Sequence, residues 1–398
     1  MRLLLLATVL AAPALALAQG QLSPPASAFS GGAPTATMKS LDQLEPRVVL
    51  GTPGTTRTTG LSISTSGSYV LAGPIAVTSG NAITISASNV TLDLNGFTLK
   101  STNPARTGAA IVIDDGCSSV SITNGFIESA VQFYINTGDP YGAGFSDGIL
   151  SDGTTSHSIH VTEIDVHSVL NHGILLLQAD ADNRLPTLDT SIENCTATDC
   201  GMIGLSANRV ARSQTDSQRR GIQAEVATDC IGESMTSYGL DALVADSCIG
   251  LSRTGIGLGG FNGCNATNCY GLNARNDYED IDATGPALEV NTALNCYAQS
   301  STNYGLRATI AATGCLGSTS KGLIGLAAPV ALACVGINTK STGFLSGAPY
   351  HGLYSGGTAS FCHGAADVDS ATALSASIAI GCTAAGPVVS ASKQLGTP

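Results

Sequence analysis

Short runs of alternating apolar and polar residues recur along most of the chain, each broken by glycine, asparagine or serine. In NVTLDLNGFTLKS (89–101), two such runs flank Asn95-Gly96, a pair that taken alone predicts a β-hairpin turn. About thirty residues later, SVSITNGFIESA (119–130) repeats both the apolar positions and the Asn-Gly pair. A hairpin has no reason to recur in this way, whereas one coil of a solenoid does. The pattern therefore predicts an architecture of stacked repeats.

A second repeat is built around cysteine. From Cys195 onward we assign nine cysteines to one pattern, in which alanine or glycine stands at the second position after the cysteine: Cys195, Cys230, Cys248, Cys264, Cys296, Cys315, Cys334, Cys362 and Cys382. Within about nine residues of most of them comes glycine followed by an apolar residue, at Gly204, Gly239, Gly255, Gly271, Gly305, Gly322 and Gly343. The basic period is about 16 to 20 residues, with longer intervals where loops are inserted.

These units predict a parallel β-helix, an all-β solenoid whose coils stack at about 4.8 Å. Cysteine is small and apolar enough to stack inside such a helix, so we expect the nine residues to form an internal ladder. Cys200 and Cys269 follow ladder members by five residues and are expected outside it. A zinc site built from these two and their neighbours is disfavoured, because three coils would separate the pairs by roughly 14 Å.

Composition narrows the class of protein further. Charged residues make up only 12% of the 398 residues, there are 47 glycines, and helical periodicity is scarce. The net charge of −12 disfavours nucleic acids and anionic membranes, because both reward basic patches. Twelve cysteines in an exported chain ordinarily indicate disulfides, and stacked coils would bring them within bridging range. The ladder pattern favours buried free thiols and leaves bonded pairs open.

The chain begins with one basic residue, an apolar run and small residues near position 18, which is typical of a secretory signal peptide. We therefore expect a signal peptide at 1–18, a linker and N-terminal cap at 19–60, a parallel β-helix at 61–390 and a C-terminal tail at 391–398. No other stretch reaches the length of a membrane span. The expected location is secreted, periplasmic or on the cell surface.

Four segments between residues 41 and 130 resemble a known protein family. LDQLEPRVVLGT (41–52), GSYVLAGPIAV (67–77), AITISASNVTLDLNGFTLKS (82–101) and VSITNGFIESA (120–130) are similar to the opening of secreted bacterial right-handed parallel β-helix proteins of the pectin-lyase-like fold. The resemblance implies that Asn95-Gly96 is a corner between two strands of one coil. Val90, Leu92, Leu94, Phe97 and Leu99 would then point inward and Asp93 outward.

Enzymes of this fold include pectate lyases, polygalacturonases and uronate C5-epimerases, and the chain completes none of their motif sets. Asp139-Pro140-Tyr141-Gly142 lacks the histidine of the epimerase Asp-Pro-His-Asp, and Asn171-His172-Gly173 is a fragment of a hydrolase motif. Most members of the family have no assigned activity. The resemblance therefore specifies the fold and leaves the chemistry to individual residues.

Four of the six histidines lie in HSIHVTEIDVHSVLNHGI (157–174). Alternation from Ile159 predicts that His160, Asp165 and His167 point outward, with His172 at the next corner. A histidine beside a carboxylate suits acid–base chemistry on a sugar. Asp165 with His167 or His172 is therefore the expected proton-transfer group, although a solvated polar strand face would look the same.

Inserted loops are expected at 178–190, 206–220, 273–286 and 346–351, all emerging on one side of the helix and lining a groove. Arg219 or Arg220 would neutralise the carboxylate of a uronate in this groove. The expected substrate-binding residues are Asp139, Tyr141, His160, Arg184, Arg209, Arg212 and Arg220. The alternative is that the arginines pair with the acidic residues at 277–282. Asp180 and Asp182 are candidate ligands for calcium, the one cofactor that the sequence suggests.

Two function classes remain open. In the first, a secreted β-helix binds an acidic polysaccharide and, as a lyase, hydrolase or C5-epimerase, cleaves or epimerises it. In the second, the helix is a non-catalytic structural or surface-interaction protein. An enzyme needs His167, His172 and the Arg219-Arg220 pair around one groove, whereas a scaffold lets them scatter.

Overall fold

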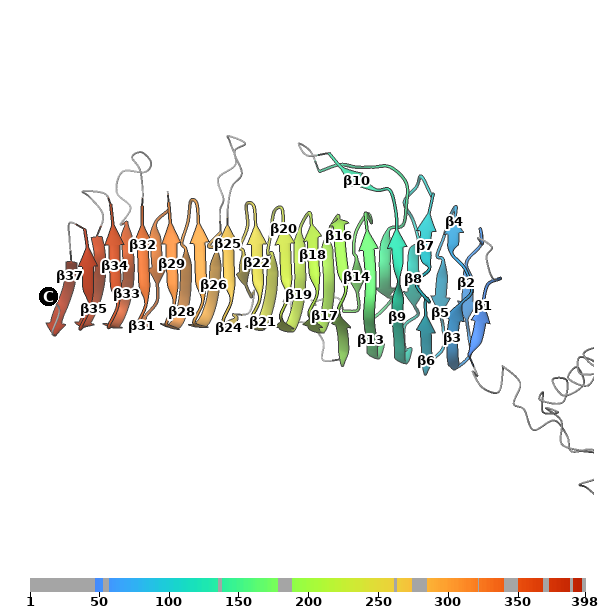
Figure 1. Cartoon of the computed structure of the whole chain (residues 1–398), viewed down its shortest axis with the longest axis horizontal. Helices are drawn as coiled ribbons and strands as arrows, with labels where there is room; N and C mark the ends of the chain where they lie inside the picture. Colours follow the sequence, from blue (N-terminus) through green and yellow to red (C-terminus); the bar gives the residue numbers. More distant parts are fainter. Residues whose placement is uncertain are drawn as a thin grey trace, which may run out of the picture. The chain divides into compact units, whose positions relative to one another are not determined.

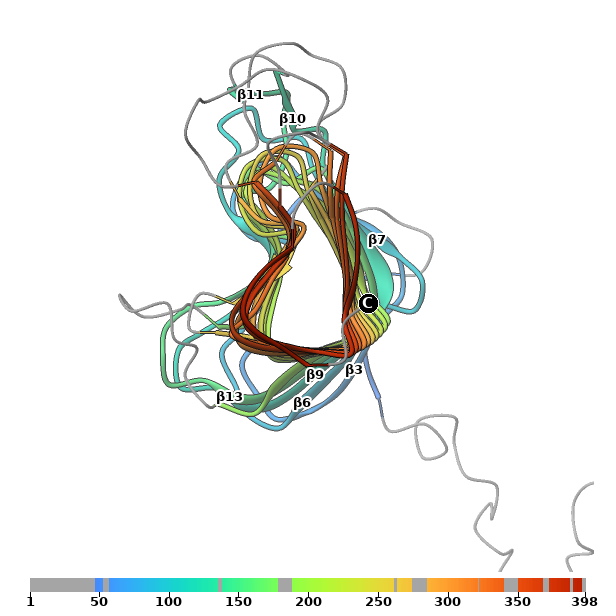
Figure 2. The same cartoon turned by 90° about the vertical axis from the view of Figure 1, so that its left-hand side faces the viewer.

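The computed structural model describes residues 47–52, 57–134, 138–177, 188–260, 263–273, 285–320, 322–339, 350–367, 372–386 and 389–395. Apart from one short hairpin, its strands between Val48 and Leu395 pair in parallel, coil upon coil, into a right-handed β-helix (Figures 1 and 2). The predicted fold class is confirmed. Strand pairing begins at Val48, before the expected start at 61, and continues to Leu395, beyond the expected end at 390. The expected signal peptide and most of the expected linker lie outside the described residues.

Each coil passes through three sheets in the same order. β8 (Ala109–Ile113) belongs to the third sheet, and the chain then enters β9 (Ser118–Glu128). β9 bends at Asn124, so its first half lies in the first sheet and its second half in the second sheet. The chain then returns through a turn to the third sheet, where β12 (Asp147–Ser151) pairs with β8.

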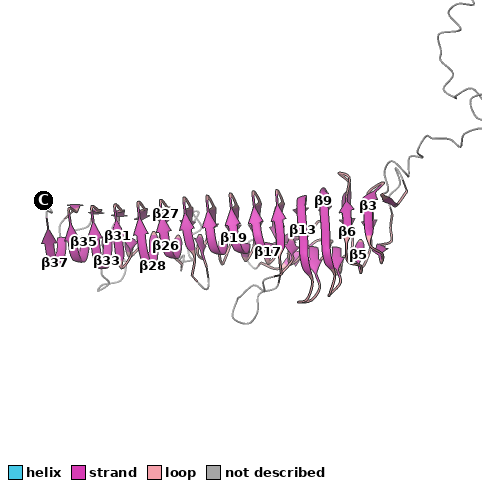
Figure 3. Ribbon diagram, turned by 90° about the horizontal axis from the view of Figure 1, so that it is seen from below, coloured by secondary structure: helices cyan, strands magenta, loops and turns pink. Residues whose placement is uncertain are grey.

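The first sheet forms the lower edge of the end-on view (Figure 2) and the front of the view from below (Figure 3). It contains β1 (Val48–Leu50), β3 (Gly67–Leu71), β6 (Val90–Asp93), β15 (Thr190–Glu193), β24 (Asn265–Thr267) and β31 (Val330–Leu332). To these it adds the first halves of β9 and β13 (His157–His167), and the ends of β17 (Ile203–Ala211), β19 (Arg220–Thr228), β21 (Leu240–Asp246), β26 (Leu288–Leu294), β28 (Leu306–Thr313), β33 (His351–Ser360), β35 (Thr372–Ile380) and β37 (Val389–Leu395).

The second sheet receives the later halves of β9 and β13. Its other strands are β4 (Ile75–Val77), β7 (Thr98–Ser101), β16 (Thr196–Cys200), β18 (Gln214–Ser217), β20 (Ile231–Ser234), β22 (Ile249–Ser252), β25 (Tyr270–Asn273), β27 (Tyr297–Ser300), β29 (Leu316–Thr319), β32 (Val335–Asn338), β34 (His363–Ala366) and β36 (Thr383–Ala385).

The third sheet receives the starts of β17, β19, β21, β26, β28, β33, β35 and β37. Its separate strands are β2 (Leu61–Ile63), β5 (Ile83–Ile85), β8, β12, β14 (Ile174–Leu175), β23 (Leu258–Gly259) and β30 (Ile324–Ala327). One antiparallel hairpin, β10 (Gln132–Phe133) with β11 (Pro140–Tyr141), stands apart from the coils in an insert between the second and third sheets.

The corner between the first and second sheets explains the opening sequence. Asn95 and Asn124 occupy the left-handed backbone region, with φ of 53° and 61°, which asparagine tolerates better than most residues. The corresponding residues in later coils include Asn194, Asp229, Ser247, Asn268 and Asn295. Asn95-Gly96 is therefore a coil corner, as the resemblance implied, and Val90, Leu92, Leu94 and Leu99 are buried. Phe97 is half-buried and packs against the same core.

The residue after each of these corners forms the cysteine ladder. Its observed members are Cys195, Cys230, Cys248, Cys269, Cys296, Cys315, Cys334, Cys362 and Cys382, with Ser213 in the coil between the first two. The prediction for Cys264 and Cys269 was wrong. Asn268 makes the left-handed corner, so Cys269 takes the ladder position, and its thiol donates to the Ala245 carbonyl oxygen at 3.4 Å. Cys264 lies one corner earlier, just before β24.

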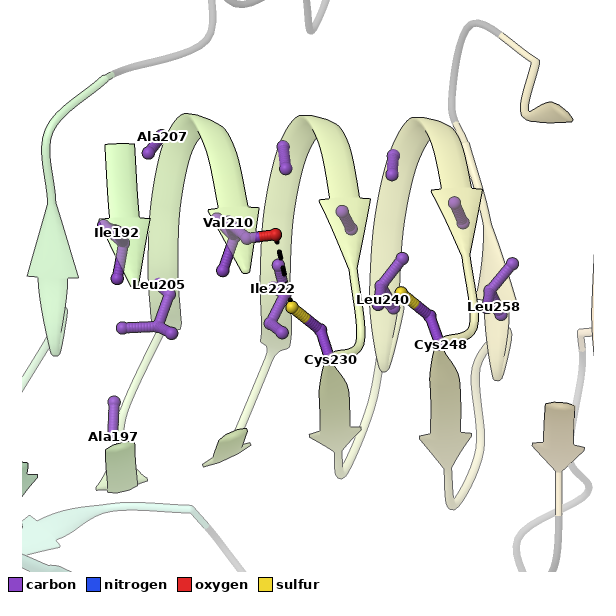
Figure 4. Packing of buried hydrophobic residues seen from close by; sticks show 14 of the residues in the cluster. Ile192, Ala197, Leu205, Ala207, Val210, Ile222, Cys230, Leu240, Cys248 and Leu258 are labelled. Atoms are coloured by element: carbon purple, nitrogen blue, oxygen red, sulfur yellow. Dashed lines mark hydrogen bonds between the residues drawn. The ribbon is translucent and has the colours of Figure 1, made fainter. Parts of the chain in front are cut away.

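All twelve cysteines are buried free thiols. In the coils shown in Figure 4, Cys230 and Cys248 point inward beside Ile222 and Leu240, and the Cys230 thiol donates to the Val210 carbonyl oxygen at 3.3 Å. Burial raises the pKa of Cys195 to about 12, which keeps its thiol protonated. The ladder therefore acts as hydrophobic packing.

Two columns of small residues face each other where the second sheet turns into the third. A Cβ atom added at Gly250 in β22 would lie 2.3 Å from the carbonyl oxygen of Gly257, and one at Gly317 in β29 would lie 2.3 Å from that of Gly325. The backbones are thus too close for a side chain, and this approach narrows the coil. The motif of glycine and an apolar residue that starts the third sheet is Gly257-Leu258 and Gly325-Leu326 in these coils.

Three glycines predicted to belong to that motif lie elsewhere in the coil. Gly255 and Gly322 lie in the turn before the third sheet. Gly271 lies in the second sheet, paired with Gly250. Gly343 is outside the described residues.

Candidate functional site

The residue that precedes the glycine or alanine at the start of each third-sheet strand occupies one register position, which we call the rim column. Its members from Asp147 onward are Asp147, His172, Ile203, Arg220, Tyr238, Ile256, Pro286, Tyr304, Ile324, His351 and Thr372. Because adjacent coils are about 4.8 Å apart, these residues form a line parallel to the helix axis. Several histidine, aspartate, arginine and tyrosine side chains of the described residues lie in this line, on one face of the helix.

At one end of the rim column, His172 and Asp147 form a hydrogen-bonded pair. Nδ1 of His172 lies 2.7 Å from Oδ1 of Asp147, and the His172 backbone N–H donates to the same oxygen at 3.2 Å. The Ser146 hydroxyl donates to the other carboxylate oxygen, and Asn171 donates to that hydroxyl at 3.0 Å. The two ring nitrogens lie on opposite sides of the imidazole, so this pairing turns Nε2 away from Asp147.

The Asp147 carboxylate stays charged despite being buried. Its side chain is only 9% exposed and that of His172 is 16% exposed. Burial alone would raise the pKa of Asp147, but the hydrogen bonds from His172 and Ser146 and the nearby charge of His172 outweigh it and lower the pKa. A fixed carboxylate behind a histidine orients the ring and fixes which nitrogen faces outward, which is the arrangement of an acid–base pair.

Two coils further on, Arg220 lies between an aromatic ring and a carboxylate. Its Nε is 3.4 Å from Oδ2 of Asp241, and its guanidinium carbon is 5.8 Å from the centre of the Tyr238 ring. Burial, with the charges of Asp241 and Glu289, raises the pKa of Tyr238 to about 12, against the opposing effect of Arg220. The Tyr238 hydroxyl therefore remains a neutral hydrogen-bonding group at ordinary pH.

A cleft of about 390 Å³ opens beside the next part of the rim column. Tyr238, Ile256, Pro286 and Tyr304 line it from the column, together with Thr236, Ser237, Gly255, Gly285, Glu289, Asn303 and Arg307. Nη1 of Arg307 is 3.0 Å from Oε1 of Glu289, and its guanidinium carbon is 5.7 Å from the centre of the Tyr304 ring. The cleft thus combines aromatic walls with one ion pair.

Further along the column, His351 is buried beside Tyr354, with 5.3 Å between the ring centres. Burial lowers its pKa, so its ring is neutral at ordinary pH. Its Nδ1 makes no hydrogen bond within the part of the chain that the structure describes. Polar and aromatic residues therefore extend along the column beyond the cleft.

The structure distributes the predicted site residues over three faces. His172 and Arg220 lie in the rim column. Asp165 and His167 lie in the second-sheet half of β13 and point outward, where Nδ1 of His167 hydrogen-bonds the Thr198 hydroxyl at 2.5 Å. Because the second and third sheets face different directions, Asp165 and His167 do not meet His172 in one groove (Figure 2).

The remaining candidates in described residues lie elsewhere. His160 is on the first sheet, where its Nδ1 hydrogen-bonds the Ser191 hydroxyl at 2.7 Å, and Arg209 is on the same sheet and exposed. Arg212 sits at a coil corner, pairs with Glu193 and donates from Nε to Asn194 at 3.0 Å.

The predicted loop at 206–220 was wrong. Strands β17 and β18 fill most of it, with Val210 and Thr215 buried as in any other coil. Arg219 is exposed in the turn before β19. The other inserts do not share one phase either. Residues 178–187 connect the third sheet to the first, whereas 274–284 and 340–349 connect the second sheet to the third.

Asp139 and Tyr141 lie in the insert that carries the β10–β11 hairpin. The Tyr141 hydroxyl lies 2.6 Å from Oε1 of Gln132, and its ring is 4.4 Å from that of Tyr134. A Cβ at Gly201 would meet the Phe133 ring of this hairpin at 2.6 Å, so the insert reaches the turns that precede the rim column. Asp139 and Tyr141 are therefore on the same side of the coil as Asn171 and His172.

Some candidates are outside the described residues. These are Asp180, Asp182 and Arg184, together with the acidic residues at 277–282, so the calcium site stays a prediction. Among described residues, no cluster of three or more His, Cys, Asp or Glu side chains is arranged to hold a metal. In the same part of the chain, no helix has the length and apolar character needed to cross a membrane.

Sequence reasoning missed Asp147, Tyr238, Asp241, Glu289, Tyr304 and Arg307. Part of the signal was available in the tripeptides Asp147-Gly-Ile, His172-Gly-Ile, Arg220-Gly-Ile, Tyr238-Gly-Leu and Tyr304-Gly-Leu. Each places a chemically distinctive residue before the glycine and the inward apolar residue. Aligning the repeats on that tripeptide would have produced most of the rim column.

Known proteins similar to this chain are found among solved structures. No family model matches the chain, and no curated protein matches it. Two solved structures are similar over most of the length, both A-modules of mannuronan C-5 epimerases of Azotobacter vinelandii. AlgE6 has 10% identity, covering 83% of this chain and 90% of its own, with a TM-score of 0.28. AlgE4 has 10% identity, covering 82% and 88%, with a TM-score of 0.31. At this level the similarity supports no argument about chemistry.

Proposed function

We propose that this protein, exported from the cell, binds an acidic polysaccharide along the third sheet and transfers a proton through His172 and Asp147. The observation behind the proposal is the rim column itself. It carries the His172–Asp147 pair, Arg220 and the tyrosines of a cleft in one line along the helix axis, and Arg307 lies beside this line, 5.7 Å from the centre of the Tyr304 ring. A linear polymer is the ligand whose shape matches such a line.

The groups suit a polymer of uronates in particular. Each guanidinium has five donors, and the ion pairs of Arg220 and Arg307 each engage a single nitrogen. The remaining donors can bind sugar carboxylates, and the faces of Tyr238 and Tyr304 can pack against sugar rings. Arg220 is two coils, or about 10 Å, from His172, so it would hold a different sugar unit from the one that reacts.

His172 would serve as the base or acid through Nε2, with Asp147 holding the ring through Nδ1. Abstraction of the proton on the carbon beside a carboxylate is the first step shared by lyases and epimerases. The histidine would take that proton. The carbanion would then either form a C=C bond as the neighbouring C–O bond breaks, with the departing oxygen taking a proton from water, or take a proton from water on the opposite face.

The test is a panel of uronate polysaccharides, with and without calcium, assayed for binding, for unsaturated products by ultraviolet absorbance and for inversion at C5 by NMR. His172→Ala should lower turnover by about 10² to 10⁴, the usual contribution of an acid–base group. His167→Ala is its matched control, because it removes a histidine from the second sheet. Loss of activity in both variants, or in neither, would contradict the proposed site.

The second candidate is a non-catalytic structural protein, and one observation favours it. Arg220, Arg307 and Arg212 already face carboxylates of the chain itself, as surface arginines of a scaffold would. Under this alternative no polysaccharide in the panel would bind. Under the main proposal, Arg220→Gln weakens binding, and Arg209→Gln on the first sheet leaves it unchanged.

A further inference from the structure

We infer that the cleft between Tyr238 and Tyr304 is a separate subsite for an acidic sugar unit, in which the sugar carboxylate displaces Glu289 from Arg307. The inference takes its class of ligand from the proposed function. It adds a position three coils from His172, about 14 Å away, where the chain binds the polymer and performs no chemistry.

The walls of the cleft combine aromatic and apolar side chains. Tyr238 and Tyr304 bracket Ile256 and Pro286 within the rim column, and three coil steps of about 4.8 Å separate the two tyrosines by roughly 14 Å. The volume of 390 Å³ falls in the usual range for small-ligand sites, about 300 to 1,000 Å³. Two apolar residues, Ile256 and Pro286, between two aromatic residues suit the C–H faces of a sugar.

Polar groups line the sides of the same cleft. Thr236, Ser237 and Asn303 come from the turns before the third sheet, and Glu289 and Arg307 come from the sheet. The hydroxyl and amide groups can exchange hydrogen bonds with sugar hydroxyls. The cleft therefore offers both apolar and polar surfaces, as a carbohydrate with apolar C–H faces and polar hydroxyl groups requires.

The Glu289–Arg307 pair would make the subsite selective for acidic sugars. The two side chains are 30% and 50% exposed, so the ion pair is weak and can exchange its partner. A ligand carboxylate that reaches Arg307 would replace Glu289 and leave it in solvent. A neutral sugar has no group to make this exchange, so it would bind less tightly.

This exchange gives the two residues opposite effects. Arg307→Gln should weaken binding of an acidic oligosaccharide, because it removes the cation. Glu289→Gln should strengthen binding about fivefold, because it removes the competing carboxylate and keeps the shape of the side chain. Neither change should alter the affinity for the carboxyl-reduced, neutral form of the same oligosaccharide.

The experiment is isothermal titration of the full chain with a uronate trisaccharide and with its carboxyl-reduced analogue. Tyr304→Ala should weaken binding of both by about tenfold, the value of one aromatic contact. Tyr297→Ala is the matched control. Its ring stacks on Tyr270 at 5.1 Å on the second sheet, so its loss should leave both affinities unchanged. Thermal melting of each variant separates loss of binding from loss of folding.

The results separate this inference from the proposed function. If His172→Ala leaves turnover intact but Tyr304→Ala weakens trisaccharide binding, the proposed reaction fails and the subsite stands. If His172→Ala abolishes turnover while folded Tyr304→Ala and Arg307→Gln bind like the wild type, the reaction stands and the subsite is overturned. Absence of trisaccharide binding to the wild type, or weaker binding by Glu289→Gln, also overturns it.

Discussion

The coils before residue 177 and those from Ala227 onward have the same path and different interiors. At one inward position of the first sheet, successive coils carry Tyr69, Leu92, Ile122, Val161, Ile192 and Val210, and then alanine in eight coils from Ala227 to Ala379. At one inward position of the second sheet, Leu99, Ile127 and Val166 give way to alanine, threonine and glycine. Large side chains fill the interior of the first coils, which we call the wide coils. In the later coils, which we call the narrow coils, the backbones of facing strands approach each other closely and cysteine side chains fill the remaining space.

The third sheet does not change in this way. Its inward position holds leucine or isoleucine from Ile83 to Leu374. The coils can therefore become narrower while the third sheet keeps one register and one inner surface. Figure 2 shows this difference in width, because the N-terminal coils extend further at its lower edge. A binding face that runs through both regions requires this constancy, which only the third sheet has.

The largest effect should follow from adding volume to the narrow coils. Gly250→Val places a side chain where a Cβ alone would lie 2.3 Å from the Gly257 carbonyl oxygen. We expect a loss above about 3 kcal/mol, beyond ordinary overpacking, because the obstacle is backbone. Thermal melting and hydrogen exchange should show the later coils opening first. Gly356→Ala is the control, since nothing lies within 4 Å of its Cβ. Equal melting temperatures of Gly250→Val and Gly356→Ala would contradict the conclusion that close backbones limit the later coils.

The next effect should follow from removing volume from the wide coils. Ile122→Ala installs the residue that later coils carry at the same position, and leaves a cavity that should cost about 2 to 5 kcal/mol. Ala312→Gly, eight coil steps away in the same column, should cost no more than about 1 kcal/mol. Chemical denaturation of both variants checks the difference. Similar losses would mean that the two interiors are packed alike.

A smaller effect should appear in acid, in the wide coils. The pKa of Asp147 is lowered in the folded protein, so its contribution to stability is complete above the unfolded value of about 4. It is lost as the pH falls through the lowered, folded value. Asp147→Asn should cost about 1 to 3 kcal/mol at neutral pH and flatten this acid dependence. Hydrogen exchange in β12 and β14, measured at pH 3 and pH 6, provides the test.

The smallest effect should come from a single rung of the cysteine ladder. Cys296→Ala removes one buried sulfur from a coil whose neighbours already pack through alanine and backbone, so we expect a loss of about 1 kcal/mol. The melting temperature of Cys296→Ala, compared with that of Ile122→Ala, measures this loss. A loss as large as that of Ile122→Ala would show that the thiols, and not the backbone approach, hold the narrow coils together.

The same difference explains what the sequence could and could not predict. Large alternating residues around Val90 and Val120 made the fold and the corner at Asn95 readable. In the narrow coils small residues weaken the alternation, so the strand around Thr215 looked like a basic loop. Cys264 and Cys269 both fit the cysteine motif, and only the left-handed corner at Asn268 distinguishes them.

The site was partly predictable for a different reason. His172 and Arg220 were expected from residue type, but their partners Asp147 and Asp241 come from neighbouring coils. Pairing across coils depends on the register of the whole solenoid, including the lengths of its inserts. The repeat pattern alone does not reveal that register, so Asp165 was the expected partner of the histidine and Asp147 was not considered.

The most direct test of the account is the affinity of the wild type for uronate oligosaccharides of increasing length. From His172 to Tyr304 the rim column spans six coil steps, roughly 29 Å. We predict that affinity rises with length until the oligosaccharide covers this distance and then levels off, and that Arg220→Gln reduces the gain for long oligosaccharides only. Affinity that does not depend on length, or a gain that survives Arg220→Gln unchanged, would contradict binding along the third sheet.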